Sequence, residues 1–198
     1  MNLYILRAKP HNINREKQFL DGDISIGWHC GQNLLNKSRK ELEDILEHNY
    51  PNISAINISQ VEQFIKIPKG SIVLTPSISK KGFLHVFKTI TLYTYRKEND
   101  IDGIGNPHMI RVEFLKTIEK TSLDKAIQKS LSGARKTVSN ISQHSEKMDV
   151  FLKSKNSTPT ISSNEGKKKA LEVLEKLLDS DDEEIRLRAS ITLLDKLE

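Results

Sequence analysis

Aromatic and basic side chains are the residues of this sequence best suited to binding chemistry. Trp28 is the only tryptophan, and it follows Gly27 at the end of an alternating segment. Tyr93 and Tyr95 share one face of another alternating segment. An accessible aromatic ring can stack on a nucleobase, which contributes about 1–3 kcal/mol per base. The basic residues that we expect to contact phosphates lie at a helix start and a hairpin end: Lys37, Arg39, Lys40, Arg96 and Lys97.

Each of these residues has a purely structural alternative. Trp28 can fill the core beside a close-packed glycine, and one of Tyr93 and Tyr95 can pack in the same way. A single surface lysine or arginine is by default solvated. Whether Trp28 lines a pocket or fills the core therefore decides the functional reading.

The sequence contains no complete catalytic set. One class of metal-dependent nucleases uses a Glu-x-Lys motif beside an acidic pair. The Glu-x-Lys that is easily found here, Glu165–Lys167, lies in a polar segment. The six histidines are scattered, and the single cysteine, Cys30, excludes an internal disulfide and a cysteine-based zinc site. The glycine-containing segment Gly103–His108 precedes a strand, so it predicts a hairpin loop rather than a phosphate loop. We expect no metal, no cofactor and no catalytic residue.

The charge favours a polyanionic partner. The net charge is +5, and it is carried by residues 1–150, whereas residues 151–198 are close to neutral. A basic body of this kind fits contact with nucleic acid. The longest apolar runs are a few residues, far short of the roughly 20 that a membrane span needs. With no secretory signal pattern at the N-terminus, we expect a cytoplasmic protein.

The periodicity predicts an α+β fold built on a small bent sheet or barrel. Strands are expected over the first eight residues, over 71–76 and in a hairpin formed by 83–96 and 109–115. Helices are inserted between strands, one opened by a capping box at Ser38–Glu41 and one by a second box at Ser59–Glu62.

The second part of the chain is expected to be helical. Helices are predicted from Ser122 onward, with Thr137 capping one of them, and again in the tail, where Ser180 opens a capping box. Short amphipathic helices in the tail need a partner to cover their leucines. The predicted organisation is a recognition domain (1–118), a basic helical connector (119–152), a flexible linker (153–169) and a helical hairpin (170–198).

The order of these segments resembles a known family. Asp23–Trp28, Gly70–Pro76, the Tyr93–Tyr95 hairpin and Arg111–Leu115 are similar to the N-terminal recognition domain of Mrr-type restriction endonucleases and related defence proteins. The resemblance covers about residues 1–152 and implies a PUA-like or EVE-like barrel that inspects a modified or flipped base. Two departures stand out: Gly70 is followed by Ser71 rather than Asp, and His85–Lys88 replaces a strand with an Ile-Gly pair. The nuclease domain of that family is missing.

These observations favour a non-catalytic nucleic-acid recognition module of restriction or phage-defence systems, with DNA favoured over RNA. The alternative is a protein-binding adaptor or inhibitor, encoded by a mobile element, that acts or self-associates through residues 170–198. A third hypothesis is a nuclease with an unrecognised site. We expect no membrane partner.

Overall fold

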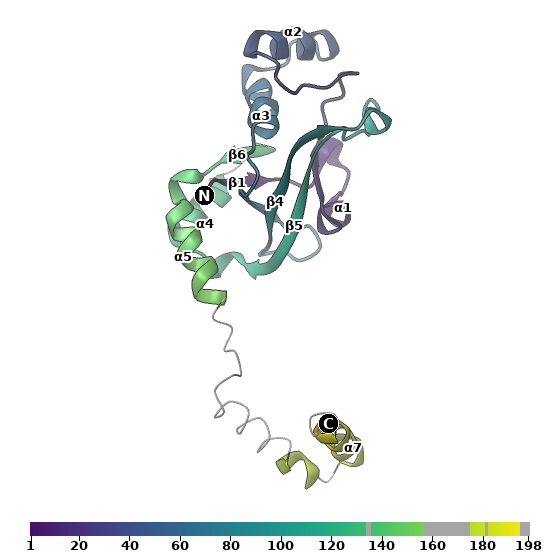
Figure 1. Ribbon diagram of the computed structural model, residues 1–198, viewed down its shortest axis with the longest axis vertical. Coiled ribbons are helices and arrows are strands. Elements are labelled where there is room, and N and C mark those ends of the chain that lie inside the picture. Colours follow the sequence, from purple (N-terminus) through teal and green to yellow (C-terminus); the bar gives the residue numbers. More distant parts are fainter. Residues whose placement is uncertain (134–135, 157–174, 181, 195–198) are drawn as a thin grey trace. The chain divides into compact units, whose positions relative to one another are not determined.

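The structure is a computed structural model that describes residues 1–133, 136–156, 175–180 and 182–194 (Figure 1). The chain divides into two compact units, Met1–Phe151 and Leu152–Glu198. Both candidate aromatic segments and every strand among the described residues belong to the first unit.

The first unit is an α+β fold whose six-stranded mixed sheet is curled into a half-barrel, as the sequence predicts. The strand order is β2-β5-β4-β3-β1-β6, in which β1 and β3 run parallel and the other neighbours are antiparallel. The strands are β1 (Leu3–Leu6), β2 (Asp23–Ile26), β3 (Ile72–Pro76), β4 (Phe83–Tyr95), β5 (His108–Glu119) and β6 (Val138–Asn140).

The curl of the sheet arises in the long β4–β5 hairpin, which dominates Figure 1. The pairing register between these strands shifts at Val86/Phe87 and again between Thr89 and Tyr93. Bulges of this kind bend a strand and increase its twist. As a result β3 pairs with the Leu84–Lys88 part of β4, while β2 pairs with the His108–Arg111 part of β5.

The helices surround this sheet at its ends and edges (Figure 1). They are α1 (Glu16–Leu20), α2 (Arg39–Asn49), α3 (Ala55–Ile65), α4 (Lys125–Gly133) and α5 (Ser145–Asn156). The capping box at α2 is confirmed, because the Ser38 hydroxyl accepts from Glu41 N–H at 3.3 Å and the Glu41 carboxylate accepts from Ser38 N–H at 2.8 Å. The second capping box was wrong, since α3 begins after Ser54, which caps it, and Ser59 lies one turn inside.

The prediction that Thr137 caps a helix was also wrong. The residues after Thr137 form β6, which pairs antiparallel with β1 from Tyr4 to Leu6. A three-residue strand at a sheet edge is stabilised by its partner and leaves little periodicity in the sequence. The predicted helix starts later, as α5, and buries Met148.

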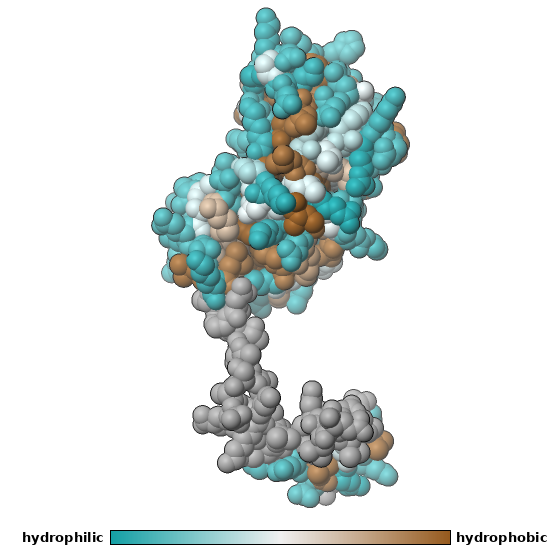
Figure 2. Space-filling view, viewed as in Figure 1, coloured by the Kyte–Doolittle hydropathy of each residue, from teal (hydrophilic) through white to brown (hydrophobic). Residues whose placement is uncertain are grey.

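The core lies between the curled sheet and helices α1, α2 and α3. Phe19, Phe64 and Phe87 are fully buried in it, and β1 is buried along its whole length. Figure 2 shows one face of the molecule, on which the apolar side chains of this unit form a narrow band between hydrophilic ones.

In the second unit the structure describes α7 (Glu183–Leu194). Its N-terminus is capped by Asp182, whose carboxylate accepts from Glu184 N–H at 2.9 Å, and not by Ser180 as predicted. The predicted linker 153–169 is helical as far as Asn156, where α5 ends. The rest of it, including Glu165–Lys167, and the start of the tail hairpin lie outside the described residues. No helix of the described residues is long and apolar enough to cross a membrane.

A buried carboxylate fastens α1 to the turn between β3 and β4. Glu16 is 5 % exposed and accepts hydrogen bonds from Ser77 Oγ, Ile78 N–H, Ser79 N–H and His85 Nε2 at 2.6–2.9 Å. Burial raises the pKa of a carboxyl group, but these donors outweigh it and hold the pKa of Glu16 at about 2. The ionised form is therefore the one that stabilises the fold.

We predict that Glu16→Gln lowers the free energy of unfolding by about 2–3 kcal/mol at pH 7, because an amide cannot accept from four donors. The Glu16 contribution is present above its unfolded pKa and is lost as the pH falls towards 2. Urea unfolding at pH 7, 4 and 2.5 checks this, with the exposed Glu47→Gln as control. The prediction is contradicted if Glu16→Gln has the same urea midpoint as the original protein at pH 7. It is also contradicted if the variant loses as much stability between pH 4 and pH 2.5 as the original protein does.

Candidate functional site around Trp28

Trp28 lies directly after β2 and lines an open pocket. The pocket has a volume of about 250 Å³ and is formed by Lys9, Pro10, His11, Gly27, Trp28, Tyr50 and Thr137. The ring is half-buried, and its inner side packs against the hydrophobic core. Trp28 thus fills both roles that the sequence leaves open.

The backbone around the pocket takes conformations that side-chain-bearing residues seldom adopt. His11, Asn12 and Trp28 all have positive φ angles, of 52°, 61° and 60°. Each such residue costs about 1–2 kcal/mol, so the surrounding structure must hold it in place. Strain of this kind concentrates at binding sites.

Gly27 is required for the close approach of the His11 ring. A Cβ placed on Gly27 would lie 2.6 Å from His11 Nε2, a distance that no side chain tolerates. His11 Nε2 is itself buried without a hydrogen-bond partner among the described residues. The pocket wall therefore contains a polar ring nitrogen that the fold leaves unsatisfied.

A hydrogen-bond chain from the β4–β5 hairpin fixes the backbone of Trp28. His108 is fully buried, and its Nε2 donates to the Trp28 carbonyl oxygen at 3.0 Å. Its Nδ1 accepts from the Tyr93 hydroxyl at 2.8 Å, and that hydroxyl accepts from Leu34 N–H at 3.2 Å. Burial lowers the pKa of His108 to about 4, so the ring is neutral at pH 7 and keeps this donor–acceptor pattern.

A second clamp comes from the loop between β4 and β5. The Asp100 carboxylate accepts from Gly31 N–H at 2.7 Å and from Cys30 N–H at 3.1 Å. It also accepts from the Tyr95 hydroxyl at 2.7 Å, and burial together with this hydrogen bond raises the pKa of Tyr95. The segment after Trp28 is thereby tied to the hairpin loop.

Tyr50, another lining residue of the pocket, is held in place by His29. Its hydroxyl shares a hydrogen bond of 2.6 Å with His29 Nδ1, and the two rings meet edge to face with centroids 5.1 Å apart. Asp102 Oδ1 lies 3.2 Å from the same nitrogen. Burial raises the pKa of Tyr50 to about 12, so the hydroxyl remains a donor at neutral pH.

The structure separates the aromatic residues that the sequence grouped. Trp28 lines the pocket, whereas Tyr93 is 4 % exposed and Tyr95 is bonded to Asp100, so neither ring lines it. Both tyrosines support the segment that carries Trp28. Tyr50, Lys9 and His11 line the pocket in place of the two tyrosines, and the sequence analysis missed all three. The available signal was a basic residue, a proline and a histidine directly after a strand.

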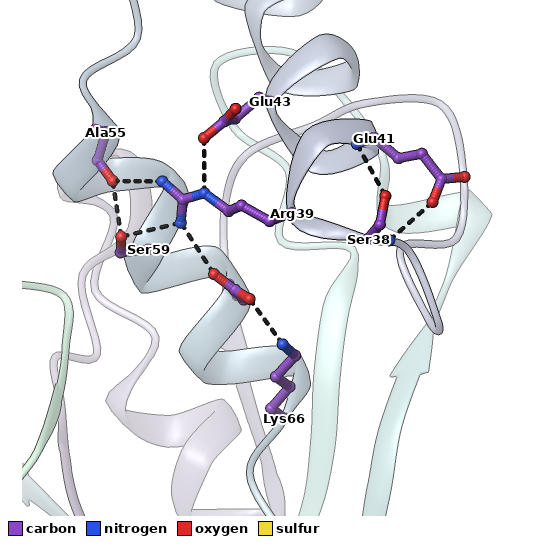
Figure 3. A network of polar contacts seen from close by, with 8 residues as sticks. Ser38, Arg39, Glu41, Glu43, Ala55, Ser59 and Lys66 are labelled. Atoms are coloured by element: carbon purple, nitrogen blue, oxygen red, sulfur yellow. Dashed lines mark hydrogen bonds and ion pairs between the residues drawn. The ribbon is translucent and has the colours of Figure 1, made fainter.

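The predicted phosphate contacts lie elsewhere than at this pocket. Arg39 joins α2 to α3 by hydrogen bonds and ion pairs with Glu43 at 2.7 Å and Glu62 at 2.9 Å (Figure 3). Lys37 pairs with Glu41, and Arg96 lies 3.2 Å from Asp23. Lys40 and Lys97 are exposed. A role of these residues in binding nucleic acid stays a prediction.

The described residues contain no group of three or more His, Cys, Asp and Glu side chains that could hold a metal ion. Cys30 is buried, its thiol donates to the Gln32 carbonyl at 3.2 Å, and burial raises its pKa to about 11. A thiol with this pKa is protonated at neutral pH and is a poor nucleophile.

Comparison with known proteins gives no relative, since no family model and no curated protein matches the chain.

We predict that the stability of the protein falls by about 2 kcal/mol between pH 7 and pH 5, because the folded state resists protonation of His108. The loss occurs as the pH falls from the unfolded pKa near 6.5 towards the folded pKa near 4. His108→Asn removes this slope, whereas the exposed His48→Asn leaves it unchanged. Urea midpoints at the two pH values measure it, and a slope that survives in His108→Asn contradicts the assignment.

We predict that Gly27→Ala displaces the His11 ring and closes part of the pocket, at a cost of about 1–3 kcal/mol in the free energy of unfolding. Because Trp28 is the only tryptophan, its fluorescence reports the change directly. Gly133→Ala is the control, since a Cβ there meets nothing within 4 Å. A Gly27→Ala protein with the stability and emission of the original contradicts the packing of His11 on Gly27.

Proposed function

We propose that the Met1–Phe151 unit is a nucleic-acid recognition module and that the Trp28 pocket receives one base. The observation that carries the proposal is a half-buried Trp28 that lines an open pocket together with Tyr50 and His11, on a backbone with positive φ. Packing in the core alone would not account for an open pocket beside Trp28.

The dimensions and chemistry of the pocket support a flat ligand. Its volume of about 250 Å³ lies just below the roughly 300–1,000 Å³ of pockets for drug-sized molecules. Trp28 offers a stacking face, and Lys9 and Thr137 offer polar groups for the edge of the ligand. The unsatisfied His11 Nε2 provides a further hydrogen-bonding group once a small rotation turns it towards the base.

Charge and resemblance extend the proposal to DNA. The basic residues outnumber the acidic ones, with a net charge of +5, and nucleic acid is the partner that such a surface attracts. The resemblance to the PUA-like or EVE-like domain of Mrr-type endonucleases supports a modified or flipped base as the feature that is read.

We expect Trp28→Ala to weaken binding of a fluorescently labelled oligodeoxynucleotide by about tenfold or more, because the stacking face is lost. Trp28→Phe retains part of the affinity, and Phe114→Leu, outside the pocket, is the control. Fluorescence anisotropy at low salt, with methylated, hydroxymethylated and unmodified bases, measures the effect. If none of these oligonucleotides binds the original protein, the proposed function is wrong.

A protein-binding adaptor remains the second candidate, and the second unit provides its supporting observation. Leu177, Ile185 and Leu187 are 39–60 % exposed there, and apolar side chains of this kind associate with a partner or a second copy. Light scattering of the full chain and of Leu187→Glu tests self-association. A smaller mass for the variant supports it, and a monomer in both cases contradicts it.

A further inference from the structure

A second hollow adjoins the Trp28 pocket. It has a volume of about 560 Å³ and shares Lys9 and Thr137 with the first pocket. Its other lining residues are Arg7, Ala8, Asn12, Pro76, Ser77 and Ile78. The two hollows therefore adjoin each other at Lys9 and Thr137. The second hollow is called the groove.

The groove lies at the carboxyl ends of the two parallel strands. Arg7 follows β1 and Ser77 follows β3, and parallel pairing places these ends side by side. Thr137, just before β6, closes the third side, because its carbonyl accepts from Arg7 N–H at 3.0 Å. The carboxyl ends of parallel strands are a recurrent place for ligand sites.

The walls of the groove are fixed before any ligand arrives. Ser77 and Ile78 are both bonded to the Glu16 carboxylate, at 2.6 and 2.9 Å. Thr137 N–H donates to the Gln60 side chain of α3 at 2.5 Å. A preformed site spends little of its binding free energy on ordering the protein.

The charge of the groove selects an anion. Arg7 and Lys9 contribute two cations, and Asn12, Ser77 and Thr137 contribute uncharged hydrogen-bonding groups. None of the described residues that line either hollow is acidic. The ionised carboxylate of Glu16 is buried and is not among the described lining residues, and its oxygens already accept from four donors.

We propose that the groove binds the sugar–phosphate of the nucleotide next to the base held by Trp28, so that the ligand is a single-stranded or locally unpaired nucleic acid. This inference rests on the proposed function. A base in the first hollow and its neighbour's phosphate in the second require the strand to leave the duplex stack, because both depressions lie side by side on one surface.

The test separates the groove from the base pocket. Arg7→Gln alters the groove alone and Trp28→Ala the base pocket alone, while Lys66→Gln removes a charge elsewhere. Asn12→Gly alters the groove and also the strained backbone beside His11. The probes are a single-stranded pentadeoxynucleotide, the matching pentaribonucleotide and the free nucleoside. Anisotropy across a salt series measures the oligonucleotides, and the NMR signal of the Trp28 indole N–H measures the nucleoside.

We expect Arg7→Gln to weaken oligonucleotide binding about fivefold and to lower the salt slope by about 0.7, the value for one phosphate contact on a single strand. Nucleoside binding stays unchanged in this variant, and Lys66→Gln behaves as the original protein. A preference for the deoxy or the ribo strand supports contact of the groove with the sugar. It also shows whether the ligand is DNA or RNA.

If Arg7→Gln and Asn12→Gly bind the oligonucleotide with unchanged affinity and salt slope, while Trp28→Ala does not, the groove proposal is wrong and the base pocket stands. If Trp28→Ala binds normally and Arg7→Gln does not, the groove stands and the base pocket is wrong. If no probe binds the original protein, both proposals fall.

Discussion

The imidazole of His108 joins the rigid hairpin of the sheet to the strained segment that carries Trp28. One ring nitrogen accepts from Tyr93 and the other donates to the Trp28 carbonyl. This pattern exists only in the neutral ring, which complete burial enforces. A tryptophan with a φ of 60° relaxes unless its backbone is held, so the shape of the pocket depends on this one side chain.

The curl of the sheet explains why distant segments meet at the pocket. Lys9 and His11 follow β1, Trp28 follows β2, Tyr50 follows α2, and Thr137 precedes β6. A flat sheet in this order would separate β2 from β1 by three strands. The register shifts in the β4–β5 hairpin bend the sheet into a half-barrel and bring the ends of its two sides together. The bulges in the hairpin are therefore part of the binding site's architecture.

Local patterns in the sequence predicted the strands of the hairpin and the start of α2. Elements that depend on tertiary contacts were not predicted. Alternation gave the hairpin strands, and the Ser38–Glu41 box gave the start of α2. The three-residue β6 exists because β1 pairs with it, which no local pattern shows. Arg39 illustrates the same limit: Glu43 lies one turn away in the sequence, but its second partner, Glu62, belongs to α3. Lys9 and His11 belong to the segment after β1, and Tyr50 follows α2. Nothing in the sequence spacing places either segment beside Trp28.

The most direct test of the account is the emission of Trp28 during titration with a single-stranded oligodeoxynucleotide. Because the chain has one tryptophan, any stacked base quenches that residue alone. We predict that the oligonucleotide quenches the Trp28 emission in a saturable way. A matched strand that lacks the base bound by the pocket, with an abasic position in its place, should quench it much less. An oligonucleotide that binds by anisotropy while the Trp28 emission stays unchanged would contradict the claim that this residue contacts the base.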